Sequence, residues 1–187
     1  MRGNKYQKLA LRTAPKNLDS TQMLLNGALG LAGESSEVVD EIKGHLFHEH
    51  WLDRTHLTKE LGDIFWYLAI ASSALGVDLD DIFKANIDKP SADLDSTQLL
   101  LNSALGLAVK SGEIIDTVKK YLFQGHSLDK FYIIKRLGDI YGYLNIASDA
   151  LGVDLDTIMQ MNIDKLKARY PDGFDAEKSI NRKEGDT

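Results

Sequence analysis

The segment Leu57–Leu75 reads LTKELGDIFWYLAIASSAL, and its apolar residues recur at alternating spacings of four and three. These residues are Leu57, Leu61, Ile64, Leu68, Ala71 and Leu75. Such a seam is expected of helices that pack nearly antiparallel in a bundle. Gly76 follows directly, and glycine is a common residue just after a helix end. The sequence therefore predicts one long helix that starts after a loop at residues 51–54 and ends at Leu75.

A second long helix is expected before this segment. Asp19 or Ser20 can cap a helix that extends to about Phe47. The apolar residues of its expected buried stripe are Leu25, Ala28, Ala32, Val39, Ile42 and Leu46. Two shorter helices are expected as well, within residues 5–14 before Pro15 and over residues 78–89. The fold class predicted from these patterns is all-α.

Acidic residues occur in pairs three apart on both long helices. The four acids are Glu34, Glu37, Glu60 and Asp63. Residues three apart share one helix face, so two neighbouring antiparallel helices would bring four carboxylates to one spot. Like charges that close raise each other's pKa unless a cation is present, and oxygen ligands favour Mg²⁺ or Mn²⁺. The pattern therefore indicates a phosphate-handling metal site, although a lone acidic pair is more often a solvated surface charge.

Glycines stand beside both acidic pairs. Gly30 and Gly33 precede the first pair, and Gly62 lies inside the second. Glycine in a helix interior is less favourable than alanine by roughly 1 kcal/mol. Its repeated use here therefore indicates that other groups approach the helix backbone closely.

The chain repeats itself with an offset of 76 residues and no gap. The segment NLDSTQMLLN at residues 17–26 returns as DLDSTQLLLN at residues 93–102, and LGVDLD at residues 75–80 returns at residues 151–156. We interpret this self-similarity as a tandem duplication.

The duplication predicts how the chain is divided. The first repeat would cover residues 1–89, and the second would cover residues 90–187 with a polar C-terminal tail. The joint between them is too short for a flexible linker. We therefore expect one globular unit, an intramolecular pseudo-dimer built around a four-helix bundle core.

The two repeats differ at the acidic positions. Two acids become bases and two stay acids: Glu34 pairs with Lys110, Glu60 with Arg136, Glu37 with Glu113 and Asp63 with Asp139. The first set carries four negative charges and requires a cation, whereas the second can neutralise itself. We expect the second set to be an ion-pair cluster or a metal-free anion site.

Composition excludes several classes of function. The chain has 187 residues, of which 43% are hydrophobic and 27% charged, as in an ordinary soluble protein. A net charge of −6 argues against nucleic acid as a partner. Without cysteine there is no disulfide, Cys-ligated zinc or Cys nucleophile. No apolar run is long enough to span a membrane, so a cytoplasmic protein with no membrane partner is expected.

The acidic motifs and their spacing resemble a known family. Gly33-Glu34-x-x-Glu37-x-x-Asp40 together with Glu60-Leu-Gly-Asp63-Ile-x-Trp-Tyr-Leu is similar to the MazG-like nucleoside triphosphate pyrophosphohydrolases. These belong to the all-α NTP pyrophosphatase superfamily, which includes the dimeric dUTPases. The resemblance extends to an opening segment at residues 6–13 and a closing segment at residues 162–174, so it covers nearly the whole chain.

The resemblance implies an activity, a cofactor and a set of site residues. Family members cleave an NTP or dNTP between the α- and β-phosphates, which gives a monophosphate and pyrophosphate. The implied Mg²⁺ ligands and catalytic residues are Glu34, Glu37, Glu60 and Asp63, with Mn²⁺ as an alternative metal. Glu37 is the acid expected to orient the attacking water.

Further residues are candidates for substrate binding. They are Asn26, Lys43, Trp66, Asn86, Lys89, Asn162, Lys165, Arg169 and Tyr170. Each cation, taken singly, is more often a solvated surface residue. Asn86 and Asn162 stand in the Asn-x-x-Lys pattern of the family's third helix, and Tyr170 stands in its closing segment. Asn26 could bind a sugar or base edge, and Trp66 could stack on a base, although helical aromatics are more often core residues.

Two functions remain as alternatives: the pyrophosphohydrolase, and a non-catalytic nucleotide-binding or regulatory module derived from such an enzyme. The opening and closing segments lie in different repeats, which predicts one working site per chain. The chain would act as a monomeric pseudo-dimer or as a homodimer of pseudo-dimers, and its tail after Phe174 could cover the site. A ferritin-like di-iron bundle is excluded because no Glu-x-x-His occurs.

Overall fold

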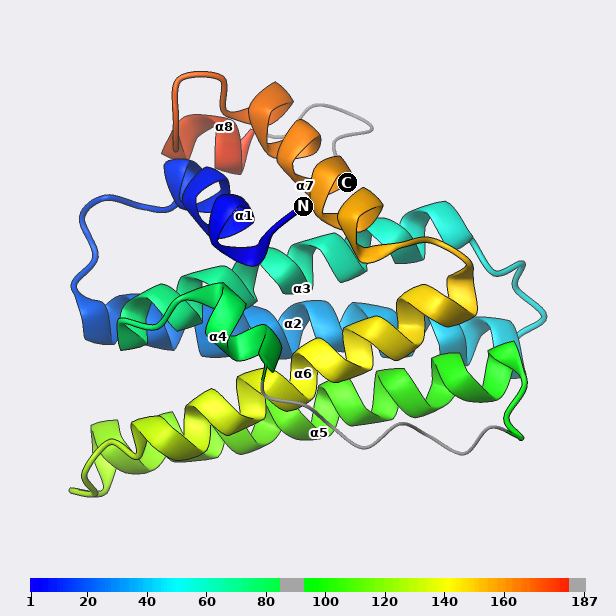
Figure 1. Ribbon diagram of the computed structural model, residues 1–187, viewed down its shortest axis with the longest axis horizontal. Coiled ribbons are helices and arrows are strands. Elements are labelled where there is room, and N and C mark those ends of the chain that lie inside the picture. The colour runs from blue at the N-terminus through cyan, green and yellow to red at the C-terminus, as the bar shows by residue number, and fades with distance from the viewer. Residues whose placement is uncertain (85–92, 182–187) are drawn as a thin grey trace.

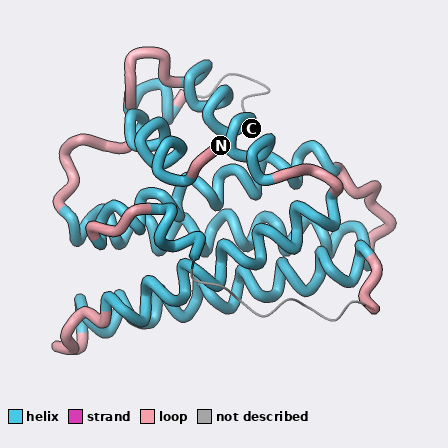
Figure 2. The backbone as a smooth tube through the Cα atoms, viewed as in Figure 1, coloured by secondary structure: helices cyan, strands magenta, loops and turns pink. Residues whose placement is uncertain are grey.

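The computed structural model describes residues 1–84 and 93–181, and within these ranges it contains eight α-helices, one short 3-10 helix and no strand (Figure 2). In chain order the elements are α1 (Gly3–Ala10), η1 (Leu11–Thr13), α2 (Ser20–Phe47), α3 (Arg54–Leu75), α4 (Leu79–Lys84), α5 (Ser96–Phe123), α6 (Lys130–Leu151), α7 (Leu155–Arg169) and α8 (Ala176–Ile180). The all-α prediction is confirmed.

The ends of the long helices are set by capping residues. Asp19 accepts a hydrogen bond from the backbone of Gln22, whose side chain accepts one in return from the Asp19 backbone, and the same capping box opens α5. At the end of α3, Gly76 adopts the left-handed conformation with φ 74°. The predicted cap and stop are therefore confirmed. The predicted third helix begins at Leu79, and its expected last residues lie outside the described part of the chain.

The four long helices form two pairs that pack against each other (Figure 1). α2 packs along α3 and α5 packs along α6, while α2 contacts α5 and α3 contacts α6. The hydroxyl oxygens of Ser35 and Ser111 lie 3.1 Å apart where α2 meets α5. The predicted seam of α3 is fully or almost fully buried, as expected for the centre of this arrangement. The tandem duplication and its boundaries remain a prediction from the sequence.

The buried stripe of α2 differs in part from the prediction. Leu25, Ala32, Val39 and Leu46 are only partly buried, whereas Leu24, Leu31 and Val38 are almost completely buried. The reason is that α2 packs against two helices, α3 and α5. A helix with two partners buries a wider part of its surface than a helix with one, and the centre of the buried part is shifted.

The shorter helices cross from one half of the chain to the other. α7 follows α6 in sequence but packs mainly along α3, and α4 follows α3 but packs mainly against α6. α1 contacts both α3 and α7, and Figure 1 shows α1 and α7 side by side on the same side of α3. The last helices of the C-terminal half are thus brought to the acidic helices of the N-terminal half. No helix in residues 1–84 and 93–181 has the length and apolar content required to span a membrane.

Candidate functional site

A cavity of about 400 Å³ opens among α2, α3, α7 and the C-terminal segment that follows α7. The side chains that line it include carboxylates from α2 and α3, aromatic rings, cations from α7, and the amide of Asn26. Elements from both halves of the chain therefore build one cavity.

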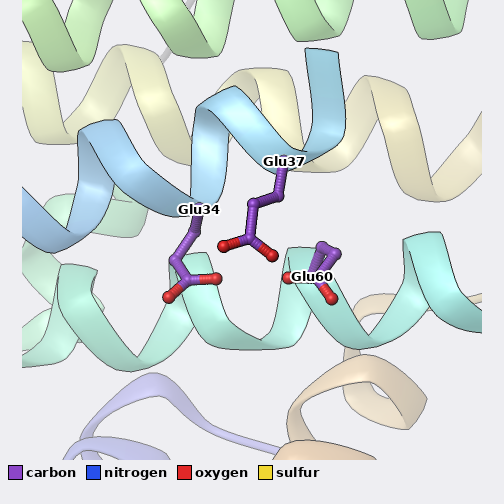
Figure 3. A group of neighbouring side chains, drawn as sticks. All are labelled: Glu34, Glu37 and Glu60. Atoms are coloured by element: carbon purple, nitrogen blue, oxygen red, sulfur yellow. The ribbon is translucent and has the colours of Figure 1, made fainter. Parts of the chain in front are cut away.

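Three carboxylates gather on the α2–α3 side of the cavity. Glu34 and Glu37 project from successive turns of α2, and Glu60 projects from the facing turn of α3 (Figure 3). One oxygen from each lies within 4.8 Å of the others. An all-oxygen set of this kind suits a hard divalent cation such as Mg²⁺ or Mn²⁺.

The electrostatics of these carboxylates fit a cation. Burial, followed by the charges of Asp63, Glu37 and Glu60, raises the pKa of Glu34 to about 8. Burial and the charges of Asp63 and Glu37 also raise the pKa of Glu60, which shares a hydrogen bond with Glu34. Without a bound cation the pair therefore retains a proton near neutral pH. A divalent ion would favour the ionised form of both groups.

Asp63 lines the same cavity but lies outside the cluster of three. Its Oδ1 accepts a hydrogen bond from the Asn162 side-chain nitrogen at 2.8 Å, and its Oδ2 is 2.5 Å from the Lys165 ammonium. The predicted quartet is thus divided: three carboxylates face one another, and the fourth is held by two residues of α7. The sequence repeat offers no sign of this arrangement, because α7 reaches Asp63 from the other half of the chain.

Aromatic side chains form another wall of the cavity. The Trp66 indole N–H donates to the Thr13 hydroxyl at 3.0 Å and approaches the Ala10 carbonyl at 3.3 Å. The Tyr67 ring meets the Trp66 ring edge to face, with the centroids 4.7 Å apart. Beyond α7, the rings of Tyr170 and Phe174 lie 5.7 Å apart and also line the cavity. A planar base is the kind of ligand that such rings bind.

Two of the three glycines allow close approach, as predicted, and the third does not. A Cβ at Gly30 would lie 2.1 Å from the Tyr67 ring, and a Cβ at Gly62 would lie 3.1 Å from the Asn162 Cβ. Around Gly33 nothing lies within 4 Å. The prediction for Gly33 was therefore wrong, because this residue is on an exposed face of α2.

The predicted substrate-binding residues fall into four groups. Those that line the cavity are Asn26, Trp66, Lys165, Arg169 and Tyr170. Asn162 lies buried behind it and reaches it through Asp63. Lys43 pairs with Asp40 on the exposed side of α2 and is not part of the cavity wall. Asn86 and Lys89 lie outside the described residues.

Sequence reasoning missed several residues of the site. The His56 Nε2 atom lies 3.3 Å from a Glu60 oxygen and His56 lines the cavity; its position one helical turn before Glu60 was a signal that could have identified it. Ser179 of α8 also lines the cavity, so part of the tail after Phe174 covers one side of it, as expected from the sequence, although Ser179 itself was not identified. Tyr6 is buried behind the site and donates a hydrogen bond to Asn162.

The corresponding positions of the C-terminal half form an ion-pair cluster, the first of the two alternatives predicted from the sequence. Glu113 lies 3.0 Å from the Lys110 ammonium and 2.8 Å from the Arg136 Nε atom, and Arg136 Nη1 lies 2.5 Å from Asp139. Burial opposes ionisation of Glu113, but Lys110 and Arg136 together lower its pKa. The cluster carries equal numbers of positive and negative charges, so it has no electrostatic need of a metal.

Two comparisons show which known proteins this chain is similar to. Residues 22–92 match the MazG nucleotide pyrophosphohydrolase domain. The chain is also similar to the Gene 37 protein of Mycobacterium phage L5, with 32% identity over 75 residues, which is 38% of this chain and 66% of the phage protein. No solved structure gives a significant match.

Proposed function

We propose that this chain hydrolyses a nucleoside triphosphate between its α- and β-phosphates, because residues 22–92 match the MazG nucleotide pyrophosphohydrolase domain. The products would be a nucleoside monophosphate and pyrophosphate. The reaction would use Mg²⁺, or Mn²⁺ in its place, held by Glu34, Glu37 and Glu60.

The observation that carries the proposal is the three-carboxylate cluster within the cavity that Lys165 and Arg169 also line. A triphosphate is polyanionic, so carboxylates alone would repel it, whereas a metal and two cationic side chains would bind it. When bound, the divalent ion would polarise phosphate oxygens as a Lewis acid. The carboxylate cluster, with a bound metal ion, and the cations of α7 would therefore bind phosphate together.

The side chains of the chain itself would divide the remaining work. Glu37 is the most exposed of the three carboxylates, so it is placed to accept a proton from an attacking water. Lys165 pairs with Asp63 in the absence of substrate and could contact phosphate from the same position. Trp66 and Tyr170 would contact the base, and Asn26 would contact its edge or the sugar.

The site would be single in each chain. The carboxylates come from α2 and α3, while Lys165 and Arg169 come from α7 in the C-terminal half. The corresponding acidic positions of that half are occupied by the neutral ion-pair cluster. The C-terminal half thus supports the site by supplying α7 rather than by forming a second one.

A panel of ribo- and deoxyribonucleoside triphosphates tests the proposal. We expect at least one nucleotide to give monophosphate and pyrophosphate, identified by ³¹P NMR, with Mg²⁺ and not after chelation. Glu60→Gln should abolish the reaction, and its thermal melt would show that the fold is retained. Binding of nucleotide without turnover of any member of the panel would instead support the non-catalytic module.

A further inference from the structure

We propose that Tyr6 is a positioning residue of this site, because its hydroxyl sets the side-chain amide of Asn162 and, through it, the carboxylate of Asp63. The role in catalysis rests on the proposed function, whereas the hydrogen-bonded arrangement does not. Tyr6 touches no substrate position itself, since it lies behind the cavity and is completely buried.

A continuous set of hydrogen bonds joins three helices behind the cavity. The Tyr6 hydroxyl of α1 donates to the Asn162 Oδ1 atom of α7 at 2.7 Å. The Asn162 amide nitrogen donates to Asp63 of α3 at 2.8 Å, and the second Asp63 oxygen accepts from Lys165 at 2.5 Å. Tyr6 therefore holds the Asn162 side chain in place, and Asn162 in turn holds the Asp63 carboxylate at the cavity.

The hydrogen bond from Tyr6 determines which way the side-chain amide of Asn162 is turned. A side-chain amide has one accepting end and one donating end, and an ionised Asp63 can only accept. A donor on the far side of Asn162 therefore keeps the amide nitrogen turned toward Asp63. Burial and the charge of Asp63 raise the pKa of Tyr6, so its hydroxyl stays protonated and remains a donor. The other acceptor near this hydroxyl, the Gly62 carbonyl, is 3.5 Å away, which is long for a hydrogen bond.

The packing around Tyr6 fixes where its hydroxyl lies. Its ring meets the Phe65 ring edge to face, with the centroids 5.9 Å apart. Gly62 lets α7 approach α3 closely, since a Cβ there would lie 3.1 Å from the Asn162 Cβ. The hydroxyl, the amide and the carboxylate thus have little room to rearrange while the hydroxyl is present.

The variant Tyr6→Phe removes the hydroxyl and keeps the ring, so it isolates this role. Outer residues that orient a metal or catalytic group typically change activity by about 10-fold to 100-fold when mutated. We expect Tyr6→Phe to lower kcat by at least about tenfold and to leave KM nearly unchanged, because no substrate contact is lost. Tyr141→Phe is the matched control: Tyr141 packs on the same Phe65 ring but belongs to α6, and the hydrogen bonds of the Asn162 amide go to Tyr6 and Asp63 instead. This control should keep the wild-type kcat.

A double-mutant cycle then asks whether Tyr6 acts through Asn162. In an Asn162→Ala background, adding Tyr6→Phe should lower kcat no further. A wild-type kcat in Tyr6→Phe, or an undiminished second loss in the Asn162→Ala background, would overturn the proposal.

A measurement without substrate separates this proposal from the proposed function. In ¹⁵N-labelled protein without metal or nucleotide, the Asn162 side-chain amide should give a shifted resonance and faster hydrogen exchange in Tyr6→Phe, but not in Tyr141→Phe. An unchanged resonance and exchange rate in Tyr6→Phe would refute the hydrogen-bonded arrangement, even if no nucleotide is hydrolysed. If no nucleotide of the panel is hydrolysed but the expected NMR change is seen, only the proposed catalytic function would be refuted.

Discussion

Glu34 has a strongly raised pKa because it is partly buried among the other carboxylates of the site. Its pKa is raised from the ordinary 4.5 to about 8, so the folded protein binds this proton more tightly than the unfolded chain does. The stabilising contribution of the protonated form is complete below pH 4.5 and is lost as the pH rises through about 8. We predict that the melting temperature of the metal-free protein falls across this window, and that Glu34→Gln, measured by thermal unfolding in chelator, removes most of the fall.

A bound divalent metal ion should reverse this fall in melting temperature. A ligand that binds only the folded state at a hundred times its Kd stabilises it by about 2.7 kcal/mol. Addition of Mg²⁺ at pH 8 should therefore raise the melting temperature of the wild type more than that of Glu34→Gln. A wild-type melting temperature that is flat or rises between pH 4.5 and 8 in chelator would contradict the assigned environment of Glu34.

Gly30 and Gly33 form a matched pair on α2. A methyl group at Gly30 would lie 2.1 Å from the Tyr67 ring, whereas a methyl group at Gly33 would meet nothing within 4 Å. We predict that Gly33→Ala stabilises the protein by about 1 kcal/mol through helix propensity. Gly30→Ala should lose about 1–3 kcal/mol through overpacking and raise the KM for nucleotide by displacing Tyr67. Urea unfolding checks both, and equal stabilities for the two variants would show that the Tyr67 ring does not constrain Gly30.

At this scale the sequence predicted the acids better than their partners. The three-residue spacing identifies Glu34, Glu37 and Glu60 because helix geometry is regular and local. Tyr6 and His56 were missed because neither belongs to the acidic motifs, although Tyr6 opens the segment that resembles the family and His56 lies one turn before Glu60. The role of Tyr6 depends on a contact with residue 162, far away in the chain. The division of the acids into three plus one likewise depends on α7.

Among the elements, α7 is the one whose placement the sequence could not predict. Its apolar residues would be buried equally well on its own neighbour α6 or on α3, so periodicity does not distinguish the two. The contacts that hold it on α3, from Asn162 and Lys165 to Asp63, are polar and distant in sequence. The lengths and ends of the four long helices, in contrast, follow from caps and seams that are local.

The pair formed by α5 and α6 is joined by the ion-pair cluster, and Arg136 is its centre. The Arg136 side chain is 17% exposed, contacts both Glu113 and Asp139, and lies over the Tyr132 ring. Arg136→Ala would leave two carboxylates without this partner, and we predict a loss on the order of 3 kcal/mol in the free energy of unfolding.

The control for this prediction is Lys119→Ala, which removes an exposed ion pair with Asp116 on the same helix α5. Such surface pairs contribute little, so its urea midpoint should match the wild type. Pyrophosphate release per folded chain should persist in Arg136→Ala, because the cluster is separate from the cavity. An Arg136→Ala variant as stable as Lys119→Ala would indicate that the cluster does not stabilise the α5–α6 pair.

The whole molecule combines two similar helical pairs with a cavity that residues of both halves line. Both pairs contribute to one hydrophobic core, and the crossing of α7 and α4 ties each half to the other. The all-α class and the paired long helices could be predicted because they follow from repeated local patterns. The shared cavity could not, because it arises where residues of both halves meet.

Comparison of the two paired glutamates tests most directly whether one metal-dependent site exists in each chain. Glu37 lies in the carboxylate cluster, and Glu113 occupies the corresponding position in the ion-pair cluster. We expect calorimetric titration with Mn²⁺ to give the same isotherm for Glu113→Gln as for the wild type, and Glu37→Gln to lose both Mn²⁺ binding and pyrophosphate release. Equal losses of Mn²⁺ binding in the two variants, or wild-type turnover in Glu37→Gln, would contradict the account.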